Sequence, residues 1–149
     1  MKVNHKLTLI FLFGLLLLAC QETELQTQTK TFSNYLATNN TAIKKDHFYI
    51  LIPSGSCKGC SKIAFEKITS LLKINHIINI TFITSNQLYS KEIPNKLCIY
   101  DSLKNLDLLN LHLGNLNIIH TKDYQIQANI EISSTNMPII DSLFGKAFN

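Results

Sequence analysis

Arginine is absent from this sequence: all 14 of its basic residues are lysines, set against 10 acidic residues. Without a guanidinium group the chain cannot make the planar, bidentate phosphate contacts of arginine, and its lysines form no basic stripe. We therefore expect no nucleic-acid partner. The sequence also lacks a Ser-His-Asp arrangement, a phosphate-binding loop and a paired-carboxylate site, which leaves three common kinds of catalytic chemistry without a motif.

A hydrophobic run long enough to cross a membrane is also missing. The N-terminal apolar run covers residues 7–19. As a helix rising about 1.5 Å per residue it reaches about 20 Å, against about 30 Å for a hydrocarbon core. Lys2 and Lys6 precede the run, and Leu-Leu-Ala-Cys at residues 17–20 ends it. A short basic region followed by a short apolar run is typical of a secretory signal.

The end of this run resembles the lipobox of bacterial lipoproteins, in which a lipid is attached to the cysteine sulfur and the chain is cut before it. The resemblance implies a signal peptide over residues 1–19 and a mature chain that begins at Cys20, anchored to membrane lipid. Gln21 implies, by the same resemblance, a location on the outer membrane facing the periplasm. An ordinary cleaved signal and an uncleaved helix are the alternatives.

Removal of residues 1–19 leaves one domain's worth of chain. Residues 20–45 are rich in glutamine, threonine and asparagine and predict a flexible tether, with a short docked helix over residues 32–37 as the alternative. The folded domain is then expected over residues 46–149.

Hydrophobic patterns predict the elements of this domain. Continuous apolar runs indicate buried strands over residues 48–52 and 77–84, and an amphipathic helix over residues 60–74 joins them as a parallel unit. Four later elements are expected: a strand over residues 96–100, a helix over 103–113, a hairpin of 118–120 with 126–132, and a helix over 137–148. The expected class is α/β, a single domain with a central mixed sheet flanked by helices.

Cys57 and Cys60 form a C-x-x-C motif between the first expected strand and the first expected helix. The unpaired amides and the dipole at a helix N-terminus favour the thiolate of Cys57, and Lys58 adds a positive charge. Cys57 is therefore the candidate attacking sulfur. Cys60 lies one turn further on, where it can attack a mixed disulfide and release the substrate.

The expected order, β-α-β-α-β-β-α with this motif after the first strand, resembles the thioredoxin-like fold over residues 46–149. The resemblance implies thiol-disulfide exchange with thiols or disulfides of envelope proteins and no cofactor. The sequence departs from the family in three places. No tryptophan precedes Cys57, residues 115–117 stand where the family carries a cis-proline, and Asp46 is a poor substitute for the family's buried acid.

Two functions follow from the motif and its departures from the family. The first is a membrane-anchored, extracytoplasmic thiol-disulfide oxidoreductase that uses Cys57 and Cys60. The alternative is a non-catalytic binding or scaffold module of the cell envelope, because loss of the proline argues for a changed substrate groove.

The cysteines also allow structural interpretations. A disulfide between Cys57 and Cys60 would close a very small loop and add little stability. A zinc site would require Cys98 and a histidine as further ligands, and the four candidate histidines lack ligand-like spacing: His47, His76, His112 and His120. Cys98, on an apolar strand, is most simply a buried small hydrophobe. No metal is therefore expected.

Overall fold

The computed structural model describes residues 23–75, 79–109, 111 and 113–145. The expected signal peptide over residues 1–19 and the expected lipidation site, Cys20, lie outside these residues. Within the described part of the chain, no helix combines the length and the apolar character that a bilayer crossing requires.

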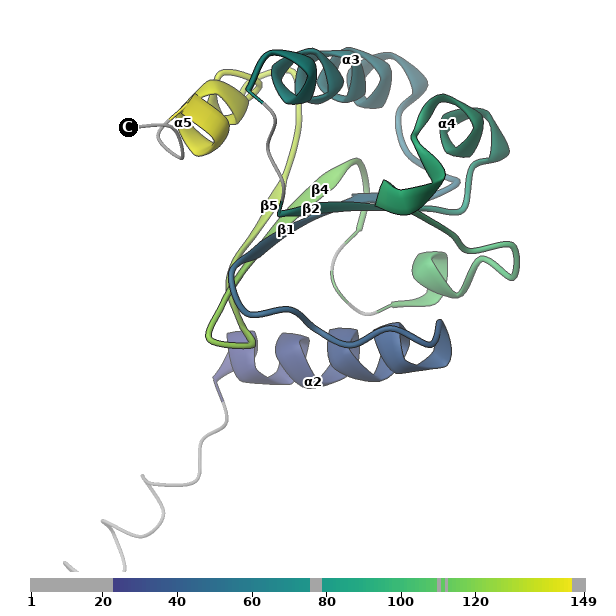
Figure 1. Cartoon of the computed structure of the whole chain (residues 1–149), viewed down its shortest axis with the longest axis vertical. Coiled ribbons are helices and arrows are strands. Elements are labelled where there is room, and N and C mark those ends of the chain that lie inside the picture. The colour runs from purple at the N-terminus through teal and green to yellow at the C-terminus, as the bar shows by residue number, and fades with distance from the viewer. Residues whose placement is uncertain (1–22, 76–78, 110, 112, 146–149) are drawn as a thin grey trace, which may run out of the picture.

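A five-stranded mixed sheet forms the centre of the fold (Figure 1). Its strands are β1 (His47–Ile52), β2 (Ile80–Thr84), β3 (Cys98–Tyr100), β4 (Asn117–Lys122) and β5 (Gln125–Glu131), in the spatial order β3-β2-β1-β4-β5. β1 pairs with β2 and β2 with β3 in parallel, whereas β4 pairs with β1 and β5 in antiparallel fashion. The predicted parallel unit, the third strand and the hairpin are therefore confirmed.

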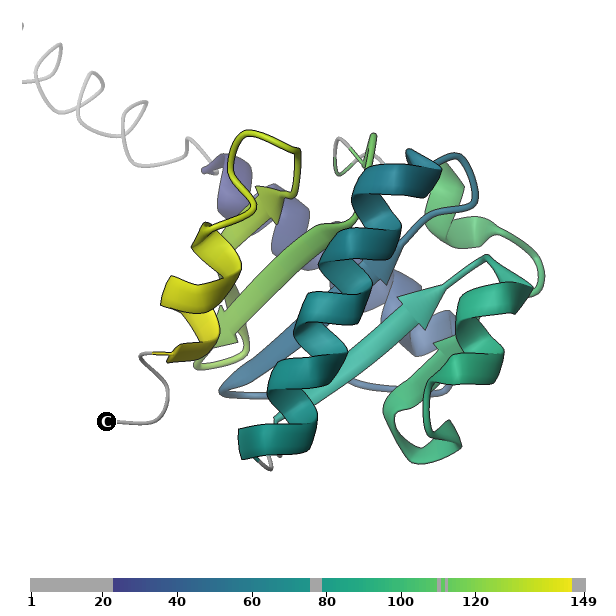
Figure 2. The same ribbon diagram turned by 90° about the horizontal axis from the view of Figure 1, so that it is seen from above.

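Helices cover both faces of this sheet. α3 (Lys58–Asn75) and α5 (Ile139–Gly145) lie over one face, and α2 (Glu24–Thr38) lies over the other (Figure 1). Figure 2 shows α3 between α5 and α4 (Gln87–Glu92), a helix that the sequence analysis did not predict. β1 and β2 are buried along nearly their whole length and are mostly apolar because helices exclude water from both of their faces. The predicted α/β class with a mixed sheet flanked by helices is confirmed.

The flexible tether predicted over residues 20–45 is wrong for the segment that forms α2. Thr23 caps this helix in a capping box with Gln26. Phe32 and Leu36 are fully buried, and the Phe32 ring meets the ring of Tyr49 edge-on with 5.0 Å between centroids. A few large side chains on one face are enough to dock the helix, although the segment as a whole is polar. The docked-helix alternative over residues 32–37 was correct in kind but too short.

The helix predicted over residues 103–113 is also wrong. Its described part is a loop with one 3₁₀ turn, η2 (Asn105–Leu108), and Lys104 before it has a left-handed backbone with φ 56°. The Asp101 carboxylate accepts a hydrogen bond from the Leu106 amide at 2.5 Å, which fixes the loop. Leu106 and Leu111 are buried while Leu103 and Leu108 are about four-fifths exposed, so the leucines do not share a helical face.

Candidate functional site

The structure places Cys57 and Cys60 together at the N-terminus of α3, as the motif predicted. Cys57 immediately precedes the helix, and its carbonyl accepts the amide of Ser61 at 2.9 Å, the first hydrogen bond of the helical ladder. Cys57 is exposed and Cys60 is half-buried, and both are free thiols in this structure. The attacking candidate is thus open to a partner, whereas the second sulfur lies behind it.

Hydrogen bonds shift the pKa values of the two thiols in opposite directions. The amide and thiol of Cys60 and the amide of Gly59 donate toward the Cys57 sulfur and lower its pKa below the ordinary thiol value. The pKa of Cys60 is raised, first by its hydrogen bond to Cys57, then by burial and by the negative charge of Cys57. Of the two thiols, Cys57 is therefore the one that ionises more readily. The side chain of Lys58, predicted to help, lies outside the described part.

The hairpin side of the site contributes Asn115, which lies just before β4. Its side-chain oxygen accepts a hydrogen bond from the backbone amide of Cys57 at 3.2 Å. Its side-chain nitrogen donates to a carboxylate oxygen of Glu131, at the end of β5, at 2.6 Å. Sequence reasoning noted residues 115–117 only for the proline they lack. The position of Asn115 directly before the first hairpin strand was the available indication, because that position lies opposite the motif.

A second contact fixes the loop between β1 and α3. The amide of Ser54 donates to one carboxylate oxygen of Asp107 at 2.9 Å, and the Ser54 hydroxyl donates to the other oxygen. Ser56 closes the same turn with a hydroxyl bond to the Pro53 carbonyl at 2.9 Å. Three segments distant in sequence, at residues 54–57, 107 and 115, therefore meet at this end of the sheet.

The structure bears on two of the departures from the thioredoxin-like family: the missing cis-proline and the substitute acid Asp46. All peptide bonds of the described residues are trans, including the one between Asn115 and Leu116. Asp46 is exposed, which agrees with the expectation that it is a poor substitute for a buried acid. No carboxylate is among the groups that shift the pKa of Cys60.

The remaining cysteine and the histidines lie elsewhere. Cys98 is half-buried on β3 and packs against the core, and burial raises its pKa. His47 is buried and shares a 2.8 Å hydrogen bond with Thr81, and His120 stacks on Phe48. His76 and His112 lie outside the described residues. Among the residues that are described, no three histidine, cysteine or acidic side chains gather as a metal site.

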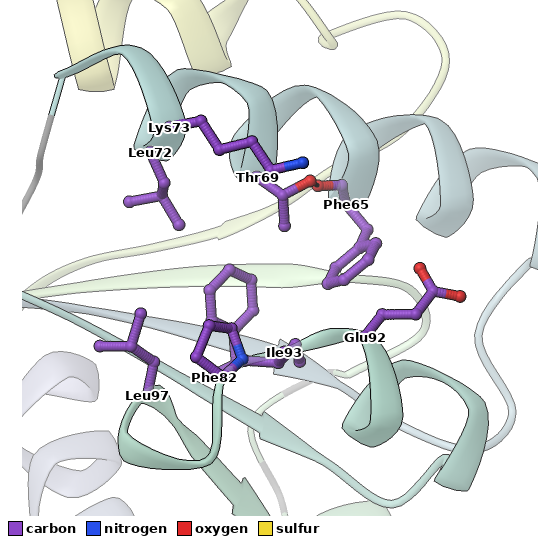
Figure 3. Close-up of a pocket in the computed structure, with 9 residues that line it drawn as sticks. Phe65, Thr69, Leu72, Lys73, Phe82, Glu92, Ile93 and Leu97 are labelled. Atoms are coloured by element: carbon purple, nitrogen blue, oxygen red, sulfur yellow. Dashed lines mark hydrogen bonds between the residues drawn. The ribbon is translucent and has the colours of Figure 1, made fainter.

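An apolar pocket of about 320 Å³ lies further along α3. Figure 3 shows Phe65 and Leu72 of α3 facing Phe82 and Leu97 across it. Tyr89 of α4 packs on Phe65 with 5.0 Å between ring centroids, and burial, with smaller contributions from the charges of Glu92, Glu66 and Cys57, raises the pKa of Tyr89. α3 thus carries the thiol pair at its N-terminus and lines this pocket further along its length.

The fold and the site define an α/β protein with a reduced thiol pair at the N-terminus of a central helix. In comparisons with protein-family models, curated proteins and solved structures, nothing matches this chain. The geometry of the site is therefore the basis for a functional assignment.

Proposed function

We propose that this protein is a membrane-anchored, extracytoplasmic thiol-disulfide oxidoreductase, with Cys57 as the attacking sulfur and Cys60 as the resolving sulfur. The observation that carries the proposal is the polarised thiol pair at the start of α3. The pKa of exposed Cys57 is lowered by amides of its own helix turn, and that of Cys60 is raised. A thiolate that is both exposed and stabilised is the form that attacks disulfides.

The reaction proceeds in two exchanges. The Cys57 thiolate attacks one sulfur of a substrate disulfide, forming a mixed disulfide and releasing the other substrate sulfur as a thiolate. Cys60 loses its proton to solvent and attacks the Cys57 sulfur, which forms the Cys57–Cys60 disulfide and releases the second substrate thiolate. Two electrons pass from the protein to the substrate, and a partner dithiol returns them. The same steps in reverse oxidise a substrate dithiol.

The arrangement of elements from β1 onward supports a thioredoxin-like domain as the scaffold for this chemistry. β1 and β2 are parallel and joined by α3, and the antiparallel pair β4 and β5 follows, with α5 at the end. The motif falls at the junction of β1 and α3, which is the position that the proposed topology requires. α2 and the edge strand β3 are additions to that core.

A disulfide-exchange assay tests the proposal. Wild-type protein should reduce or oxidise a model protein disulfide, Cys57→Ser should lose the activity, and Cys60→Ser should trap the mixed disulfide. Cys98→Ser is the matched control, because Cys98 is remote on β3, and it should retain activity. Equal and slow exchange by wild type and Cys57→Ser would rule out catalysis.

The location forms a separate part of the proposal. Cleavage before Cys20 and lipid on its sulfur would place the domain on the cell envelope, at the periplasmic face of the outer membrane, where envelope proteins supply thiols and disulfides. Mass spectrometry of the mature N-terminus tests it. Lipid mass should be found on Cys20 and should disappear in Cys20→Ser, whereas an unmodified Cys20 thiol would reject the anchor.

A non-catalytic envelope binding module is the second candidate. Asn115 and its trans peptide bond, in place of a cis-proline, favour it, because the Asn115 side chain lies beside Cys57 where a substrate backbone would approach. The two functions differ in the response to a mild thiol reductant. A cycling Cys57–Cys60 disulfide accepts electrons from it, and a purely structural disulfide resists.

A further inference from the structure

The side chain of Asn115 uses both of its polar atoms in one chain of contacts. The oxygen accepts the Cys57 amide at 3.2 Å, and the nitrogen donates to Glu131 at 2.6 Å. The Glu131 contact also fixes the amide orientation, since only the nitrogen can donate to a carboxylate. The first residue of the motif is thereby linked to the ends of both hairpin strands.

Gly114 makes room for this chain of contacts. A Cβ atom on Gly114 would lie 2.9 Å from the Glu131 carboxylate oxygen, closer than real side chains come. The backbone of Gly114 does not have positive φ, so the absence of a side chain here serves space rather than conformation. A side chain on Gly114 would therefore displace the Glu131 carboxylate that holds Asn115.

We propose that Asn115, held by Glu131, is the positioning residue of Cys57. By occupying the Cys57 amide, Asn115 fixes the backbone from which the sulfur projects, so that the sulfur stays aligned with the amides of Gly59 and Cys60. Without this hydrogen bond the backbone of Cys57 can rotate, and the sulfur then loses the amide donors that stabilise its negative charge. This inference deepens the proposed oxidoreductase function and rests on it for its biological meaning.

The alkylation rate of each cysteine gives the test. Full-length protein is treated with iodoacetamide between about pH 5 and pH 10, a range that brackets ordinary thiol pKa values. Proteolysis after Lys58 separates Cys57 from Cys60, so mass spectrometry reads the two thiols individually, with Cys98 as an internal reference for unfolding.

Asn115→Ala should slow Cys57 alkylation near neutral pH by about three- to tenfold, the effect of one lost hydrogen bond, and should move its pH midpoint upward. Gly114→Ala should act in the same direction more weakly, because the carboxylate must shift. This milder variant carries the test if Asn115→Ala fails to fold. Glu131→Gln retains an acceptor for the Asn115 side-chain nitrogen, so the Cys57 midpoint should not rise.

Asn117→Ala is the matched control, since Asn117 begins β4 two residues after Asn115 and its side chain donates to Asn129 instead. An unchanged Cys57 profile in Asn115→Ala, or equal slowing in Asn117→Ala, would overturn the positioning role. The disulfide-exchange assay separates this from the parent proposal. Exchange by wild type with no Asn115 effect rejects positioning alone, and an Asn115 effect without exchange rejects the oxidoreductase alone.

Discussion

The two faces of the sheet are built differently. The face under α2 is closed by polar contacts as well as apolar packing: the Tyr35 hydroxyl donates to Asp101 at 3.2 Å, and Asn129 donates to the Leu111 carbonyl at 3.1 Å. The face under α3 and α5 has an apolar core and carries the thiols at its rim, where Cys57 remains exposed. Packing on either face sets stability, and only the rim of the α3 face sets thiol reactivity. Substitutions on the two faces should separate these properties.

The largest effect is expected for Phe32→Ala on the α2 face. Phe32 is fully buried against Tyr49, so its loss should lower the free energy of unfolding by about 3–5 kcal/mol, as measured by urea denaturation. The pH profile of Cys57 alkylation in the folded protein should stay unchanged. Phe65→Ala on the α3 face is the counterpart. It should also destabilise, because the buried Phe65 ring packs against Phe82 and Tyr89.

A pH-dependent effect of intermediate size is expected from His47. Burial, assisted by the nearby charge of Lys44, lowers the pKa of His47 to about 4. Since the unfolded histidine titrates near pH 6.5, the unfolded state binds the proton first, and stability is lost as pH falls from about 6.5 to about 4. At pH near 4.5 the loss should be about 2–3 kcal/mol.

The measurement is urea denaturation at neutral and acidic pH. His47→Asn, which keeps a polar group near Thr81 without the titration, should flatten this part of the pH dependence. Equal slopes for the variant and the wild type would contradict the assignment to His47.

A smaller effect is expected for Tyr35→Phe, which removes one hydroxyl from the α2 face. Burial and the Asp101 carboxylate raise the pKa of Tyr35, so the hydroxyl remains a donor to Asp101 at physiological pH. Loss of this donor should cost about 1–2 kcal/mol in urea denaturation, because Asp101 keeps the Leu106 amide as a partner. A cost near that of Phe32→Ala would mean that this hydrogen bond, rather than packing, holds α2.

The smallest effect is expected for Lys67→Ala. Lys67 of α3 pairs with Asp141 of α5 at 2.6 Å, but the Asp141 side chain is more than half exposed. The expected loss is below about 1 kcal/mol and should shrink with added salt. Lys62→Ala, which breaks only the pair with Glu66 inside α3, is the control and should cost still less.

The sequence predicted most of the α3 face and little of the α2 face. Continuous apolar runs reveal β1 and β2 because nearly every position there is buried, and the motif places Cys57 at the start of α3. The length and burial of α2 were underestimated because its contacts depend on a few large residues within a polar segment. The leucines of residues 103–113 were misinterpreted because a left-handed residue, Lys104, and the Asp101 carboxylate set that loop. Such tertiary contacts have no local sequence period.

The Asn115 contacts were beyond prediction for the same reason. Cys57 and Asn115 are 58 positions apart, and their hydrogen bond exists only because β4 pairs with β1. The position of residues 115–117 before the first hairpin strand indicated that they lie opposite the motif, but the hydrogen bond from the Cys57 amide to the Asn115 side chain could not be predicted from the sequence.

Because α2 begins at Glu24, only a short segment separates the folded domain from Cys20, the expected lipidation site. Thr23 caps the helix, and three peptide steps separate it from Cys20, a span of at most about 10 Å when fully extended. If Cys20 carries lipid, the domain rests against the bilayer, with α2 and the sheet face it covers next to the anchor. The α3 face lies on the other side of the sheet from α2 (Figure 1). Substrates would then be selected by how closely their disulfides approach the membrane surface.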